Sequence, residues 1–126
     1  MRQLVFIALL FLGGCEGIFQ ARYEPHSAFL LAEIKTLSLL GQDECGGEQE
    51  SKYIRLTWEK TLLLLNYTKS VDISDSRNYA IEIHSVSEVF YFDDQTRDIT
   101  TFFCKEQYLN LRDLVDVGIQ IEQLRR

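Results

Sequence analysis

A nine-residue apolar run near the start of the chain, Leu4–Leu12, constrains this sequence most, because it decides which part folds and in which compartment. Arg2 precedes the run, and two glycines follow it. A membrane-spanning helix needs about 20 apolar residues, so the run is too short to span a bilayer and has the form of a secretory signal. The chain is therefore expected to be exported, and its leader is expected to take no part in the fold.

Two kinds of leader fit the residues that follow. Leu12-Gly13-Gly14-Cys15 matches a bacterial lipobox, in which cleavage follows Gly14 and the Cys15 thiol carries a lipid. The alternative is a plain eukaryotic leader, cleaved after Gly17, which would discard Cys15. The cysteine directly after the apolar run and two glycines favours the lipobox. The sequence thus predicts a signal peptide over 1–14 and a lipid-anchored tether over 15–24.

The residue after Cys15 indicates where a lipoprotein of this kind would go. Glu16 is not the aspartate that is typical of retention in the inner membrane, so we expect sorting to the periplasmic face of the outer membrane. Two or three acyl chains anchor a protein stably, whereas one chain does not. In the alternative, the protein is secreted.

Length and charge restrict the mature part to a few classes of protein. The 126 residues leave roughly 110 after the leader, which suits a single domain over 25–126. Residues 16–126 contain 12 basic and 19 acidic residues, a formal net charge of −7. An acidic domain without a basic stripe is a poor candidate for binding nucleic acid or anionic lipid. We therefore expect a protein partner, with membrane contact only through the N-terminal lipid.

Three cysteines are an awkward number for an exported protein, and the leader resolves it. Cys15 is either lipidated or removed, which leaves Cys45 and Cys104. Two cysteines in an exported domain most simply form one disulfide. The alternative is two unpaired buried thiols.

Apolar spacing predicts an all-α fold, a small four-helix array tied by that disulfide. Pro25 suits a first helical turn, and the apolar residues behind it predict a helix over 25–40. Further helices are expected over 48–67, over 79–92, and from a cap at Asp93, Asp94 or Thr96 to the end of the chain. Residues 68–78 have the composition of a linker. Residues 79–92 also alternate and are rich in β-branched and aromatic side chains, so a strand there is the alternative.

Motifs for catalysis or metal binding are missing from this sequence. His84 and Glu88 lie one helical turn apart but lack the second histidine of a metalloprotease pair. Asp93, Asp94 and Asp98 do not have the spacing of a calcium loop and are better explained as capping residues. We expect no enzyme activity, no metal and no cofactor. Asn66 begins a glycosylation sequon, which matters only in a eukaryotic protein.

A small helical domain rich in tyrosine and phenylalanine can offer a groove to an amphipathic segment of a partner. Most of the aromatic side chains are expected in the core. Trp58, Tyr79 and Phe90 are the candidates for lining such a groove.

Two stretches carry a resemblance to a known family: "AFLLAEIKTLSLLGQDECG" (Ala28–Gly46) and "SRNYAIEIHSVSEVFYFDDQTRDITTFFC" (Ser76–Cys104). Together with the lipobox cysteine, they make residues 15–115 resemble the PulS/OutS-type pilotins of type II secretion systems, in pattern more than in identity. The resemblance implies a non-enzymatic chaperone whose lipid carries a secretin subunit to the outer membrane. It also implies a groove that holds a short C-terminal helix of the secretin, a lipid on Cys15, and a disulfide between Cys45 and Cys104.

Two other functions fit the same residues. One is a secreted eukaryotic helical protein that acts as an extracellular ligand, with a glycan on Asn66. The other is a periplasmic inhibitor lipoprotein that blocks an enzyme or a phage receptor. The mass of the mature N-terminus separates the first of these from a lipoprotein, since only a lipoprotein begins with an acylated Cys15.

Overall fold

The computed structural model describes residues 25–71 and 74–124, and these fold into four helices. They are α2 (Pro25–Asp43), α3 (Glu50–Val71), α4 (Ser74–Thr96) and α5 (Thr101–Leu124). The described residues contain no strand, which confirms the all-α prediction. Residues 79–92 lie inside α4, so the strand alternative for them is wrong. None of the helices in these two ranges is long and apolar enough to cross a membrane.

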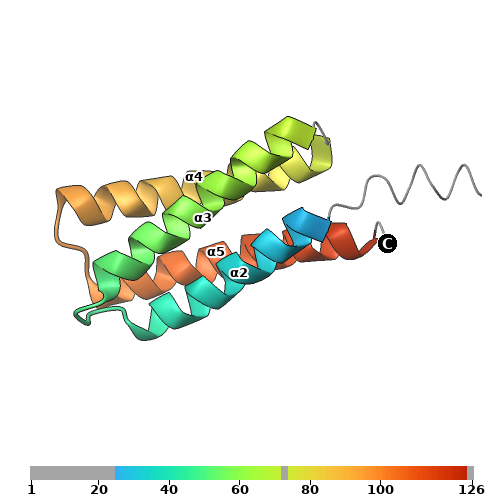
Figure 1. Cartoon of the computed structure of the whole chain (residues 1–126). Helices are drawn as coiled ribbons and strands as arrows, with labels where there is room; N and C mark the ends of the chain where they lie inside the picture. Colours follow the sequence, from blue (N-terminus) through green and yellow to red (C-terminus); the bar gives the residue numbers. More distant parts are fainter. Residues whose placement is uncertain (1–24, 72–73, 125–126) are drawn as a thin grey trace, which may run out of the picture.

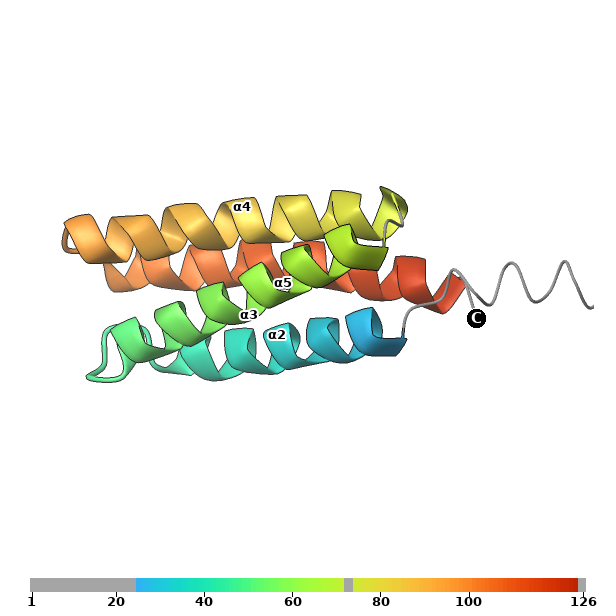
Figure 2. The same ribbon diagram turned by 45° about the horizontal axis from the view of Figure 1, so that its top comes forward.

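The helices form an up-and-down bundle in which each packs mainly against two neighbours. Going around the bundle, α2 packs on α3, α3 on α4, α4 on α5, and α5 on α2. Figures 1 and 2 show the start of α2 and the end of α5 at one end of the bundle. The α2–α3 loop and the α4–α5 connection lie at the other end (Figure 1). The first turn of α2 and the last turn of α5 therefore lie at the same end of the bundle.

The helix boundaries differ from the prediction, most of all around residues 68–78. The linker predicted over 68–78 is wrong, because α3 continues to Val71 and α4 already begins at Ser74. Hydroxyl side chains made this stretch look like a loop, but Thr68 and Ser70 donate their hydroxyl protons to the carbonyls of Leu65 and Tyr67 within α3. Such bonds let serine and threonine sit inside a helix.

The predicted cap of the last helix is also wrong. Asp93, Asp94 and Thr96 belong to the end of α4, and α5 begins only at Thr101. Thr100 is the residue that caps α5, since its hydroxyl accepts a hydrogen bond from the Phe103 amide at 3.0 Å. A threonine just before the first turn satisfies an amide that otherwise has no partner.

The disulfide predicted between Cys45 and Cys104 is present, with an S–S distance of 2.05 Å. It joins the α2–α3 loop to the first turn of α5. Gly46 follows Cys45 with a φ of 84°, a conformation that residues with a Cβ rarely adopt. The bond therefore fastens the loop end of the bundle, where α2, α3 and α5 meet.

The core is aliphatic along most of its length and aromatic near the disulfide. Phe90 packs edge-on against both Tyr108 and Phe103, with ring centroids 5.0 Å and 6.2 Å apart. Burial raises the pKa of the Tyr108 phenol well above its usual range. The fully enclosed hydrophobic side chains are Leu30, Leu31, Ile34, Ile54, Leu64, Ala80, Ile83, Phe90, Cys104, Tyr108, Leu111 and Val115.

Small residues let α5 lie close to α2. A Cβ placed on Gly41 of α2 would stand 2.4 Å from the Tyr108 ring, so the ring occupies the space of the missing side chain. Gly118 of α5 is buried against Leu31 and Tyr79 in the same manner. The contact between α2 and α5 is thus tight at these two glycines.

Candidate partner-binding groove

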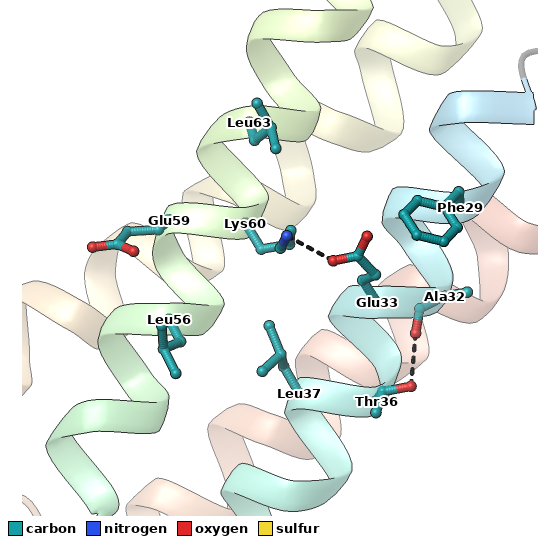
Figure 3. A pocket seen from close by; sticks show the side chains of 9 residues that line it. All are labelled: Phe29, Ala32, Glu33, Thr36, Leu37, Leu56, Glu59, Lys60 and Leu63. Atoms are coloured by element: carbon teal, nitrogen blue, oxygen red, sulfur yellow. Dashed lines mark hydrogen bonds and ion pairs between the residues drawn. The ribbon is translucent and has the colours of Figure 1, made fainter.

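A pocket of about 790 Å³ opens on the other side of α2, between α2 and α3. Its size falls within the range of about 300 to 1,000 Å³ that is usual for ligand sites. Both walls are helical, so every lining side chain comes from the surface of α2 or α3 (Figure 3). The lining residues are Phe29, Ala32, Glu33, Thr36, Leu37, Leu56, Glu59, Lys60 and Leu63.

Large apolar side chains face solvent along this pocket. Phe29 of α2 is 60% exposed and Leu63 of α3 is 47% exposed. Leu37 and Leu56, further toward the loop end, are half-buried. Apolar side chains on two neighbouring helices that do not close on each other are typical of a groove for an amphipathic helix.

One ion pair spans the groove between its two apolar parts. The Lys60 Nζ lies 2.6 Å from Glu33 Oε2, and both side chains are about 30% exposed. Figure 3 shows the pair reaching from one helix to the other, with Phe29 and Leu63 on one side of it and Leu37 and Leu56 on the other. The carboxylate of Glu59 points away from α2 in the same view and lies 3.9 Å from Arg55 Nε. Glu33 and Lys60 therefore balance each other, and Glu59 adds one further carboxylate to the lining of the groove.

His26 and Tyr67 close the groove at the end that lies away from the α2–α3 loop. The rings of His26 and Tyr67 meet edge to face, with centroids 4.5 Å apart. His26 belongs to the first turn of α2 and Tyr67 to the last turns of α3, so this contact bridges the two helices one turn beyond Phe29 and Leu63. The groove is thereby limited to about three helical turns.

Sequence reasoning missed this groove, although one signal for it exists. Phe29 and Leu37 count toward the apolar spacing that predicts the first helix, together with Leu30 and Ile34. Leu30 and Ile34 fill the core, while Phe29 and Leu37 lie on the side toward α3. The apolar residues of this helix cover more of its circumference than one core face requires, and this excess could have indicated a second, solvent-facing apolar surface.

The three aromatic residues predicted to line a groove lie elsewhere. Trp58 stacks on Tyr91 of α4, with the ring centroids 4.6 Å apart. Phe90 is 1% exposed and Tyr79 is 4% exposed, and both belong to the core. None of the three lines the α2–α3 groove.

Tyr79 instead takes part in a buried polar network at the end of the bundle away from the disulfide. Its hydroxyl donates to Glu122 Oε1 at 2.8 Å, and the Ser76 hydroxyl donates to the same oxygen at 2.9 Å. Burial raises the pKa of the Tyr79 phenol well above its usual range. The network joins α4 to α5 and does not line the α2–α3 groove.

His84, which the sequence does not identify as a metal ligand, is buried in the structure. Its Nδ1 lies 3.2 Å from the Thr61 hydroxyl, and its Nε2 lies 3.5 Å from Glu88 Oε2. Burial lowers the pKa of His84, and this effect outweighs the opposing influence of Glu88. The side chain links α3 to α4 as part of their packing.

A second, polar pocket of about 400 Å³ lies beside the disulfide. It contains acidic side chains of the α2–α3 loop, of α3 and of the end of α4, with Arg97 among them. Arg97 pairs with Asp93 at 3.2 Å. Within 25–71 and 74–124, no three His, Cys, Asp or Glu side chains are arranged to hold a metal ion.

The remaining predicted sites lie partly outside the described residues. Cys15, the signal peptide and the tether fall in residues 1–24 and are not described. Asn66 is exposed on α3, but the hydroxyl of Thr68, the third residue of its sequon, is buried and bonded to the Leu65 carbonyl.

Comparison with protein-family models, with curated proteins and with solved structures finds no match for this chain.

Proposed function

We propose that this protein is an exported, lipid-anchored adapter of the pilotin type. Its α2–α3 groove holds a short helix of a secretin subunit, and acyl chains on Cys15 carry the complex to the outer membrane. The observation that carries the proposal is the groove itself, which Phe29 and Leu63 line as exposed apolar side chains of two neighbouring helices. The lipobox spelling supports the anchor.

The groove favours a helix over other occupants. An extended peptide would need partners for its backbone N–H and C=O groups, and the walls are helices whose backbone groups are already paired. A bare hydrocarbon chain would bury the Lys60–Glu33 pair against apolar matter, which is unfavourable. A helix pairs its own backbone N–H and C=O groups, and it can present both apolar and polar side chains to the groove.

The groove is tested with two matched substitutions in the full-length chain, processed by its native host. Phe29→Asp places a charge in the groove, whereas Phe102→Asp places one on α5, at a phenylalanine that is 74% exposed and outside the groove. We expect Phe29→Asp to weaken secretin binding at least about tenfold and to leave the secretin in the inner membrane, with Phe102→Asp unchanged. Equal effects of the two variants would contradict the proposal.

The anchor is tested separately. The intact mass of the purified protein should show acylation at Cys15, and Cys15→Ala should release the protein from the membrane fraction. An unmodified N-terminus near Ile18 would contradict the lipoprotein and favour a secreted ligand. A correctly placed secretin in cells that lack this protein would favour an inhibitor instead.

A further inference from the structure

The groove is layered along its length, and the layers differ in chemistry. Phe29 and Leu63 make an apolar layer, Glu33 and Lys60 make a charged layer, and Leu37 and Leu56 make a second apolar layer. Phe29 and Leu37 are separated by about 12 Å along α2, and Leu56 and Leu63 by about 10.5 Å along α3, at 1.5 Å per residue. Two side chains at i and i+7 of a docked helix are also about 10.5 Å apart, so such a pair matches the two apolar layers.

The charged layer of Glu33 and Lys60 determines which residue the docked helix needs between its two apolar side chains. The Lys60 ammonium has three N–H donors and the Glu33 carboxylate has two acceptor oxygens, so their mutual bond uses only part of each. Both side chains are about 30% exposed, and a docked helix would cover them. A covered ion pair whose remaining donors and acceptors find no partner is strongly unfavourable.

An amide side chain supplies what this pair needs. Glutamine and asparagine offer a carbonyl to Lys60 and an N–H to Glu33 at the same time. A single charged side chain satisfies one member of the pair and repels the other. A leucine offers neither a donor nor an acceptor.

From this complementarity we infer that the groove selects a helix that presents an apolar residue, an amide residue and an apolar residue at i, i+3 or i+4, and i+7. Glu33 and Lys60 are the residues that determine this specificity. The inference rests on the proposed function, since it names the kind of helix that the same groove binds.

The test uses three synthetic peptides of about 18 residues, each held helical by a lactam bridge on its outer face. All have leucine at i and i+7, and they differ only at i+4, which is glutamine, leucine or glutamate. Binding is measured by fluorescence anisotropy on the natively processed full chain in detergent micelles. We expect the glutamine peptide to bind about tenfold or more tightly than either of the others.

Two double variants show whether the ion pair is the cause. Glu33→Leu with Lys60→Leu turns the middle layer apolar and should make the leucine peptide the tightest. Glu33→Lys with Lys60→Glu keeps a balanced pair with its direction reversed and should keep the preference for glutamine. Thermal unfolding of each variant checks that the bundle is intact. An unchanged order of the peptides in the first double variant would overturn the inference.

Phe29→Asp separates failure of the inference from failure of the proposed function. If all three peptides bind equally and Phe29→Asp abolishes their binding, the groove is a helix site without the inferred selectivity. If no peptide binds, the inference and the helix-binding function are both contradicted. The inference is also wrong if peptides bind only after residues 16–24 are cut away, or if the chain forms a dimer that Phe29→Asp dissolves, because the occupant is then its own tether or a second copy.

Discussion

The two sides of α2 show how the same helix can make a closed contact and an open one. Toward α5, Gly41 leaves room for the Tyr108 ring, and Lys35 pairs with Asp116 at 2.8 Å at the edge of a filled contact. Toward α3, no glycine lies in the contact, and Glu33 and Lys60 stand between the two apolar layers of the pocket. Glycine in the contact with α5, and a charged pair inside the pocket toward α3, therefore distinguish the closed face of α2 from the face proposed to bind a partner.

The disulfide holds the end where both contacts of α2 begin, and its removal should have the largest effect on stability. Cys45→Ser with Cys104→Ser opens a loop of sequence separation 59. In the chain-entropy description this costs about 4 kcal/mol of unfolding free energy. Urea unfolding of the double variant against the oxidised protein measures the loss. A loss below about 1 kcal/mol would show that helix packing alone fixes this end.

Filling the closed side should cost nearly as much. Gly41→Ala forces a Cβ into the Tyr108 ring and is expected to cost about 3 kcal/mol, because the ring is buried on all sides. Ala32→Leu, on the open side, is the control and should change stability by less than about 0.5 kcal/mol while it blocks peptide binding. The reverse order of the two stability effects would contradict the contrast between the two sides.

The Glu33–Lys60 pair should matter for binding more than for folding. Partly exposed pairs contribute about 0 to 1 kcal/mol, so Lys60→Met is expected to cost at most about 1 kcal/mol of unfolding free energy. Replacing both residues by leucine should be neutral or slightly stabilising in the free protein. Urea unfolding checks both values. A loss of more than about 2 kcal/mol in the double variant would mean that the pair holds α2 and α3 together.

The smallest expected effect is a dependence of stability on pH through His84, which lies between α3 and α4, away from α2. Burial lowers its pKa from 6.5, while Glu88 raises it and Lys69 lowers it. Below pH 6.5 the unfolded chain binds a proton that the folded chain resists, so stability should fall as the pH drops toward the folded pKa and stay level above 6.5. His84→Gln should flatten this slope in urea unfolding at about pH 5 to about pH 7.5. An equal slope in both proteins would exclude His84 as its source.

Much of the fold follows from local pattern. The helices around 25–40, 48–67 and 79–92 were predicted from apolar spacing, and the structure confirms them with different ends: all three extend further at the C-terminus, while α3 begins two residues later than predicted. The predicted boundary between the second and third helices was wrong where serine and threonine occur. Their hydroxyls are common in loops, but they can also donate hydrogen bonds to carbonyls of their own helix. Thr68 and Ser70 look like loop residues in sequence, yet they bond to the helix that contains them. A local pattern cannot tell these uses apart, because the choice depends on what covers the helix.

The candidate site was much harder to predict. Large aromatic residues were the natural candidates for a binding surface, but Tyr79 and Phe90 were drawn into the core because their burial removes the most apolar area from water. The groove is formed instead by Phe29 and Leu63, which are far apart in the chain, and by an ion pair between residues 33 and 60. No sequence spacing connects these residues.

The sequence by itself predicted the helices and the pairing of Cys45 with Cys104, which the structure confirms, since each follows from local periodicity or from a count of a few residue types. The export of the chain stays a prediction. Only the tertiary structure decided which contact between neighbouring helices closes. That outcome depends on the sizes and charges of side chains on two helices at once. Gly41 meets Tyr108 on one side of α2, and Glu33 meets Lys60 on the other. Neither contact can form before the helices pack against each other.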